Sequence, residues 1–315
     1  MSSGCRRRLS RASARVPTRS TLRSLGSVTV PTALVTGAST GIGRATVLRL
    51  AAAGWSVLAG VRDSAAGGEL AAQAGAGLNP ISLDVTDEAQ IAAAAELVAA
   101  QTQPTTAGSP GPGRLDALVN NAGIGLGGPL ELVSAEEWRT QFEVNVFGQA
   151  AVTRALLPAL RAASGRIVFV SSVGGRVSVP FNGPYAASKH ALEAIGDALR
   201  GELHSSRIKV SLVEPGGVKT PIWDKARALA GQFTVPPELE REYARVPAAL
   251  TKLMNDSERR GVSPERVAAT IERALTARRP RARYVVGGEA HGMIAAHALL
   301  PTAAFDRLLR RVMNV

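Results

Sequence analysis

Short apolar runs alternate with alanine-rich helical stretches along most of the chain, and this alternation constrains the fold more than any other feature. The apolar runs predict strands over Thr32–Thr36, Ser56–Val61, Pro80–Leu83, Ala117–Asn120, Arg166–Ser171, Lys209–Val213 and Arg283–Val286. Apolar positions at helical spacing predict helices over Ile42–Ala53, Asp87–Ala100, Ala135–Ala162, Pro184–Ser205 and Pro264–Ala277. Repeated strand–helix–strand units predict an α/β fold, a doubly wound parallel sheet with helices on both faces.

Positive charge is concentrated at the start of the chain. The formal net charge is +12, yet residues 1–30 hold seven arginines and no acid. This head is rich in Arg and Ser and has no periodic apolar positions, so we expect residues 1–30 to be disordered. A targeting peptide and a nucleic-acid-binding arm are the alternatives for this head. Because the rest of the chain is only mildly basic, we expect no nucleic-acid partner.

Cysteine and histidine usage limits other classes of protein. The one cysteine, Cys5, lies in the head, so no intramolecular disulfide can form and the cytoplasm is the expected compartment. No apolar run reaches the roughly 18 residues of a membrane-spanning helix, and we expect no secretory signal. The histidines have no partner at a metal-ligand spacing, so we expect no metal site. They are His190, His204, His291 and His297.

Three segments interrupt the alternation. Residues 102–114, with clustered Pro and Gly, predict a surface loop. Residues 221–262 suit a substrate lid, and an ordinary helical excursion on the surface is the alternative. Residues 288–315 predict a helical tail in which arginines interleave with apolar positions. Such a tail could dock on the lid, on a second subunit or on a membrane surface.

A glycine-rich turn follows the first predicted strand. It reads Thr36-Gly37-Ala38-Ser39-Thr40-Gly41-Ile42-Gly43 and leads directly into a predicted helix. Glycines there let backbone N–H groups and the helix N-terminus approach a pyrophosphate. The spacing departs from the G-x-G-x-x-G pattern of other dinucleotide folds. We therefore predict a dinucleotide site at this turn, with an ordinary tight strand–helix turn as the alternative.

Further motifs follow the glycine turn in order along the chain. They are Asn120-Asn121-Ala122-Gly123, Ser172, Tyr185-Ala186-Ala187-Ser188-Lys189 and Pro215-Gly216. With these motifs, residues 32–286 resemble the short-chain dehydrogenase/reductase family, in particular its hydroxysteroid and retinol dehydrogenase branch. The resemblance implies a single-domain, seven-stranded Rossmann fold. We expect this catalytic domain to span residues 31–287.

The end of the second strand is expected to decide between NAD and NADP. NAD enzymes place a carboxylate there, whereas this chain has Val61 followed by Arg62. A guanidinium at Arg62, with a second at Arg44, suits a 2′-phosphate, so we expect NADP(H) to be favoured over NAD(H). The alternative is that both arginines are solvated surface charges.

The turn and the resemblance together define a larger set of predicted cofactor residues. The resemblance places Asp84 and Val85 around the adenine, Asn120 beside the adenosine half, and Gly217 and Thr220 near the nicotinamide. The full predicted set is Gly37, Ser39, Thr40, Gly41, Ile42, Gly43, Arg62, Asp84, Val85, Asn120, Ala122, Gly123, Tyr185, Lys189, Pro215, Gly216, Val218 and Thr220.

Tyr185 and Lys189 are the predicted reacting pair. A phenol with a pKa of about 10 is a poor base near neutrality unless a cation favours the phenolate. The two residues are four apart on a predicted helix and so share one face. By the resemblance, Ser172 donates to the substrate oxygen. Asn145 resembles the family's asparagine that holds a water in a proton relay through Lys189; a buried side chain bonding a helix carbonyl is its alternative.

The sequence therefore predicts an oxidoreductase that prefers NADP(H) and moves a hydride between nicotinamide and a lipophilic secondary alcohol or ketone, with Tyr185 as general acid and base. An NADPH-binding sensor without turnover is the alternative. Epimerases and dehydratases are disfavoured because no second domain is apparent. The resemblance implies a homodimer or homotetramer. Apolar candidates for the substrate pocket are Val179, Phe181, Trp223 and Phe233.

Overall fold

The computed structural model describes residues 30–100, 113–222 and 235–313. Contacts within the chain divide it into Met1–Val30 and Pro31–Val315, and every described helix and strand belongs to the second unit. Several predictions lie outside the described residues: the head up to residue 29, most of the loop at 102–114, and the pocket candidates Trp223 and Phe233.

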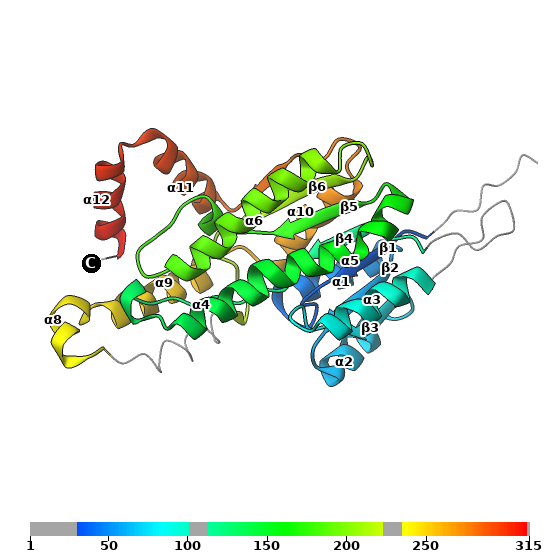
Figure 1. Ribbon diagram of the computed structural model, residues 1–315. Coiled ribbons are helices and arrows are strands. Elements are labelled where there is room, and N and C mark those ends of the chain that lie inside the picture. The colour runs from blue at the N-terminus through cyan, green and yellow to red at the C-terminus, as the bar shows by residue number, and fades with distance from the viewer. Residues whose placement is uncertain (1–29, 101–112, 223–234, 314–315) are drawn as a thin grey trace, which may run out of the picture. The chain divides into compact units, whose positions relative to one another are not determined.

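Seven parallel strands form one sheet in the order β3-β2-β1-β4-β5-β6-β7. Strands are added in one direction from β1 to β3 and in the other from β4 to β7, so the order reverses beside β1 (Figure 1). The strands are β1 (Thr32–Val35), β2 (Ser56–Val61), β3 (Leu78–Ser82), β4 (Ala117–Asn120), β5 (Arg166–Val170), β6 (Lys209–Pro215) and β7 (Arg283–Val286). The predicted doubly wound, seven-stranded Rossmann fold is confirmed. In such a sheet, ligands bind beyond the carboxyl ends of the strands at the reversal point.

Helices cover both faces of the sheet and bury two apolar cores. On β1, Ala33 and Val35 face one core and Leu34 faces the other, because side chains alternate along a strand. Helices α1, α2 and α10 contribute to the first core, and α3, α5 and α6 to the second (Figure 1). These helices are α1 (Gly41–Ala52), α2 (Ser64–Ala74), α3 (Glu88–Ala100), α5 (Gly148–Ala163), α6 (Gly183–Glu202) and α10 (Pro264–Thr276).

The sequence did not predict α2. Gly67 and Gly68 lie inside this helix, and each glycine costs roughly 1 kcal/mol of helix propensity relative to alanine. Packing explains why the helix forms: a methyl group at Gly67 would lie 3.0 Å from Pro80 Cβ and 3.1 Å from Val61 Cγ2. Glycine thus lets α2 lie close against β2 and β3. Pro80 itself lies within β3 because β3 is an edge strand, where a missing N–H is tolerated.

The predicted helix over Ala135–Ala162 is helical throughout, but the sequence did not predict the π turn inside it. The segment consists of α4 (Ala135–Phe142), a π-helical stretch η2 (Glu143–Phe147) and α5. A methyl group at Gly148 would lie 2.5 Å from the Val85 oxygen, so α5 starts in close backbone contact with the loop after β3. A π turn holds one more residue than an α turn, and the apolar spacing of the sequence does not reveal that addition.

The segment after β6 and the chain's last described residues are helical. They comprise η4 (Pro237–Leu239), α8 (Glu240–Tyr243), α9 (Val246–Arg260), α11 (Gly288–Leu299) and α12 (Thr302–Met313). On α9, Val246, Leu250 and Met254 cluster with Phe181 and Tyr243. Figure 1 shows α11 and α12 joined by a sharp turn. Across the described ranges, the helices are too short or too polar to cross a bilayer.

Candidate active site

The glycine turn after β1 has the backbone that its sequence requires. Gly37 and Gly41 have φ angles of +64° and +54°, which L side chains rarely adopt. A methyl group at Gly43 would lie only 2.2 Å from the Gly37 oxygen, so α1 packs directly on the turn. The first turn of α1 carries no acid, so its N–H groups and positive dipole end remain suited to an anion. The turn fits the pyrophosphate of a dinucleotide.

Two polar side chains join this turn to the end of β4. Thr36 Oγ1 accepts hydrogen bonds from the backbone N–H groups of Asn121 and Ala122, both at 3.0 Å. Asn121 Nδ2 donates to the Thr36 oxygen at 2.9 Å and to the Gly37 oxygen at 3.0 Å. Thr36 and Asn121 therefore hold the turn against the neighbouring loop, and neither was among the predicted site residues. The sequence could have indicated both residues, because Thr36 belongs to the glycine-rich turn and Asn121 to the Asn120–Gly123 motif.

The predicted cofactor residues gather at the carboxyl edge of the sheet. Asn120 Nδ2 donates to Thr153 Oγ1 at 2.8 Å, while its buried Oδ1 has no partner among the described residues. Thr220 comes close to Gly41, where an added methyl group would lie 3.0 Å from Thr220 Cγ2. Ala122 and Gly123 follow β4, Asp84 and Val85 follow β3, and Pro215, Gly216, Gly217 and Val218 end or follow β6; Ser39, Thr40 and Ile42 belong to the turn itself.

The two arginines predicted to face a 2′-phosphate are exposed, and each makes a polar contact with a neighbouring side chain. Arg62 Nη1 lies 3.9 Å from Asp84 Oδ2, and Arg44 hydrogen-bonds Gln73 of α2. Exposed ion pairs contribute at most about 1 kcal/mol, so the contact to Asp84 holds Arg62 only weakly. Gly41 and Arg44 also line a hollow of about 650 Å³. Both guanidinium groups remain able to reorient toward a ligand.

Asn145 lies at the centre of the π-helical stretch η2. Its Oδ1 accepts from the Ile124 N–H at 2.8 Å, and its Nδ2 donates to the Ile124 oxygen at 2.9 Å and to Ser188 Oγ at 3.1 Å. The buried side chain therefore binds the loop after β4 and helix α6 rather than a carbonyl of its own helix. A methyl group at Gly123 would lie 3.3 Å from Asn145 Oδ1 and 3.7 Å from Lys189 Nζ. The structure thus brings Asn145, Gly123 and Lys189 together.

Tyr185 and Lys189 share one face of α6. Lys189 Nζ lies 5.8 Å from the centroid of the Tyr185 ring and donates to the Val170 oxygen at 2.8 Å. Burial lowers the pKa of the Lys189 ammonium to about 8, and the Glu193 carboxylate opposes that shift. Burial raises the pKa of the Tyr185 phenol above its ordinary value, and its hydrogen bond with Ser172 opposes that shift.

The structure distinguishes Ser172 from Ser171. A methyl group at Gly174 would lie 3.3 Å from Tyr185 Cε1 and 3.4 Å from Ser172 Oγ, so these two side chains approach one point. Ser172 Oγ also accepts from the Gly174 N–H at 3.0 Å, which orients the hydroxyl. Ser171 Oγ is buried elsewhere, without a partner in the described ranges. Ser172 is therefore the serine that lies beside Tyr185, and its predicted catalytic role stays a prediction. His190 is exposed and binds the Ala186 oxygen at 2.9 Å.

A cluster of two buried glutamates and two partly exposed arginines near Lys189 was missed by the sequence analysis. Arg283 Nε lies 2.9 Å from Glu193 Oε2 and 3.1 Å from Glu214 Oε1, and Arg176 lies 3.4 Å from Glu214. Burial raises the pKa of Glu214 to about 7, and the Glu193 charge acts in the same direction, against Arg176 and Arg283. The available signal was a glutamate inside the apolar run Val213-Glu214-Pro215.

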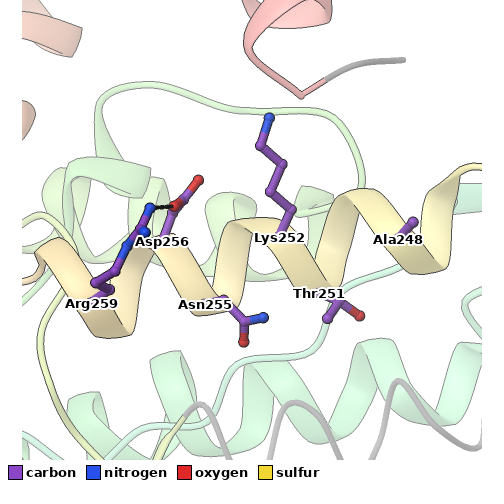
Figure 2. A pocket seen from close by; sticks show the side chains of 6 residues that line it. All are labelled: Ala248, Thr251, Lys252, Asn255, Asp256 and Arg259. Atoms are coloured by element: carbon purple, nitrogen blue, oxygen red, sulfur yellow. Dashed lines mark hydrogen bonds and ion pairs between the residues drawn. The ribbon is translucent and has the colours of Figure 1, made fainter.

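A polar hollow of about 510 Å³ lies along α9, away from these residues (Figure 2). Figure 2 shows the ion pair between Arg259 and Asp256, with a 2.8 Å separation, in its lining. No predicted site residue belongs to the part of the lining that the structure describes. That lining is Ala248, Thr251, Lys252, Asn255, Asp256 and Arg259. Elsewhere in the described chain, no three His, Cys, Asp or Glu side chains group as metal ligands do.

The sequence model of the short chain dehydrogenase family matches residues 31–230. The chain is a short-chain dehydrogenase. It is 36% identical over 281 residues to the NADPH-dependent 3-dehydrocapnine reductase of Ornithobacterium rhinotracheale, covering 88% of this chain and 95% of that protein. It is 33% identical to mouse retinol dehydrogenase 5, covering 87% and 86%. A solved short-chain dehydrogenase from Streptomyces avermitilis superimposes with a TM-score of 0.71 at 33% identity, covering 86% and 93%.

Family membership confirms the predicted resemblance, including the similarity to retinol dehydrogenases. It also gives the class of reaction. As a short-chain dehydrogenase, the chain is an oxidoreductase that uses a nicotinamide cofactor and acts on CH–OH groups and the matching carbonyls.

Proposed function

We propose that this short-chain dehydrogenase interconverts a lipophilic secondary alcohol and its ketone with NADP(H), and that Tyr185 is the general acid and base. The convergence of Tyr185 and Ser172 on one point, with the Lys189 ammonium 5.8 Å from the phenol ring, carries the proposal. Negative charge develops on the substrate oxygen during ketone reduction, so a proton donor is needed there.

Each side chain has a distinct task in this proposal. Bound nicotinamide would supply or accept the hydride. The Ser172 hydroxyl donates a hydrogen bond to the substrate oxygen, and the Tyr185 phenol gives that oxygen its proton in reduction or removes it in oxidation. The Lys189 ammonium makes the phenolate less costly. We assign Asn145 a positioning role, because its amide ties the loop carrying Gly123 to α6; a water relay through Lys189 stays a prediction.

The preference for NADP(H) rests on the charge at the end of β2. NAD enzymes have an acid at this position, which would repel a 2′-phosphate, whereas this chain has Val61 followed by Arg62. Arg44 on α1 adds a second exposed cation. The similarity to an NADPH-dependent reductase supports the same choice. Arg62→Ala is expected to raise the KM for NADPH about tenfold and to leave the KM for NADH unchanged, in line with about 1.4 kcal/mol for one charge-assisted contact. An unchanged KM for NADPH would remove Arg62 from the cofactor site.

A lipophilic substrate fits the apolar contact between Phe181, close to Tyr185 in the sequence, and α9 in residues 221–262. Phe181, four residues before Tyr185, packs on Val246, Leu250 and Met254, so α9 lies against the loop that leads into α6. We propose that residues 221–262 act as the substrate lid within a catalytic domain spanning residues 31–287. Retinol is itself a lipophilic alcohol, and a relative is named for it. We further propose a cytoplasmic homodimer or homotetramer.

The first experiment compares NADPH and NADH oxidation across a panel of lipophilic ketones for wild type, Tyr185→Phe and the matched control Tyr284→Phe. Tyr284 is a buried tyrosine of β7 whose hydroxyl accepts only the Arg281 N–H among the described residues, at 3.0 Å. We expect NADPH-preferring turnover that Tyr185→Phe lowers at least a hundredfold and Tyr284→Phe preserves. Turnover that persists in Tyr185→Phe would refute the mechanism. Tight NADPH binding without any turnover would favour a sensor.

A further inference from the structure

Exposed apolar side chains are concentrated near the end of the chain. Eight large apolar side chains of the described residues are exposed, and four of these lie between residues 299 and 312. Leu299 is 81% exposed and Val312 is 60% exposed, and Leu300 and Leu308 are the other two. Single exposed leucines are common, whereas a local group of this kind marks an interaction surface.

Helix α12 has more apolar surface than the fold covers. Phe305, Leu309 and Met313 are buried and follow each other at intervals of four residues along one face. Phe305 and Leu309 pack against Val177 and against α11. Leu308 and Val312 form a second apolar row, displaced by about 100° around the helix from the buried row. This second row is exposed.

Arginines border the exposed row. Arg307 and Arg311 each precede one of its residues by one position, and Arg310 is also exposed. Asp306 is the single acid of α12. A helix with an exposed apolar row beside arginines suits the boundary between lipid headgroups and acyl chains, because long arginine side chains reach the headgroups while leucine and valine enter the apolar layer.

The charge of this surface disfavours a second copy of the chain as its occupant. A two-fold contact places the same patch of each copy against itself, so the arginines of one α12 would face those of the other. Like charges repel, and a single aspartate offsets little of the repulsion. An anionic bilayer complements Arg307 and Arg311, which border the exposed row.

The surface adjoins the proposed lid and the loop that follows Ser172. Val177, which packs beneath α12, belongs to that loop. At the other end of α12, Lys252 Nζ donates to the Val312 oxygen at 3.3 Å, which ties α12 to α9. A ligand that arrives at α12 is therefore next to α9, which packs on Phe181, four residues before Tyr185.

We propose that α12, with the turn that joins it to α11, docks on an anionic lipid bilayer and admits the lipophilic substrate from that bilayer. The docking proposal rests only on the exposed surface of α12 and does not depend on the proposed function. The delivery of substrate rests on the proposed function.

Vesicle co-sedimentation of the full chain tests the docking without turnover. The vesicles are pure phosphatidylcholine or phosphatidylcholine with phosphatidylglycerol. We expect the protein to bind the anionic vesicles, and Leu308→Glu/Val312→Glu to lower the partition coefficient at least tenfold, because two apolar contacts are lost and two repelled charges are gained. Arg307→Gln/Arg311→Gln is expected to lower binding to anionic vesicles only. Leu97→Glu on α3, with the same 40% exposure as Leu308, is the matched control and should bind like wild type.

Two outcomes would overturn the docking proposal. If Leu308→Glu/Val312→Glu sediments with anionic vesicles as wild type does, another part of the chain, such as residues 1–30, carries the binding. If wild type ignores vesicles and the same double variant lowers its oligomeric state in light scattering, the surface is a subunit interface. Reduction of a short, water-soluble ketone by the double variant shows that its fold is intact. Substrate delivery predicts that anionic vesicles raise turnover of a long-chain ketone in wild type and not in the double variant; equal responses would refute delivery and leave the docking result standing.

Discussion

Gly43→Ala is expected to disrupt the cofactor site from inside the glycine turn. The added methyl group would lie 2.2 Å from the Gly37 oxygen, 2.9 Å from the Gly37 carbonyl carbon and 2.6 Å from Asn121 Nδ2. Two of these three atoms belong to the backbone and cannot rotate away. Helix α1 must therefore move off the turn, and Asn121 must give up its hydrogen bond to the Gly37 oxygen, 3.0 Å in length.

The magnitude follows from those contacts. Overpacking costs about 1–3 kcal/mol, and a lost hydrogen bond about 1 kcal/mol, so the total is roughly 2–4 kcal/mol. If the fold resists, this free energy appears as a loss of cofactor affinity of about 30-fold to 1,000-fold, since about 1.4 kcal/mol is a factor of ten. If α1 instead shifts to relieve the clash, the same cost lowers the free energy of unfolding.

Two assays separate these outcomes: calorimetric titration with NADPH and urea unfolding without cofactor. Gly68→Ala is the matched control, because Gly68 lies in the interior of α2 with nothing within 4 Å of an added methyl group. It should raise the free energy of unfolding by about 0.5–1 kcal/mol and leave NADPH affinity unchanged. The reasoning fails if Gly43→Ala keeps both the wild-type affinity and the wild-type unfolding free energy to within about 0.5 kcal/mol.

Three further predictions concern charges and caps. The raised pKa of Glu214, about 7, means that its protonation favours the folded state, so this contribution is complete below pH 4.5 and disappears as pH rises through 7. Glu214→Gln should therefore lose less stability than wild type between pH 5 and 8 in urea unfolding; equal losses would contradict this. Ketone reduction should fall as pH rises through about 8, where Lys189 loses its proton, and Glu193→Gln should move that midpoint lower because the Glu193 carboxylate raises the pKa of Lys189; a pH–rate profile checks both. Ser263 accepts the Arg266 N–H as the N-cap of α10, so Ser263→Ala should cost about 1 kcal/mol in thermal unfolding, and no change would mean that the cap contributes nothing.

Several parts of the fold and site were predictable because they depend on short-range pattern. Buried parallel strands read as apolar runs, and all seven were located, with boundaries shifted by a few residues. The turn Gly37–Gly43 carries its own backbone requirement, and four residues of helix place Lys189 on the same face as Tyr185 whatever surrounds them. Ser172 was predicted from spacing within a family, which encodes the same geometry.

Other features were decided by contacts between segments distant in sequence. Helix α2 has a low intrinsic helix propensity because of its glycines. It forms because Gly67 lets the helix pack closely on Pro80. The π turn that turns Asn145 toward Ile124 arises where α5 meets the loop after β3. The partly buried group of Glu193, Glu214 and Arg283 draws on three elements, so the position of Glu214 in an apolar run did not reveal which charges it meets. The sequence by itself therefore determined the sheet, the turn and the spacing of the reacting residues, which are local. Only the tertiary structure decided which side chains meet, because burial and charge act between segments that the chain order does not bring together.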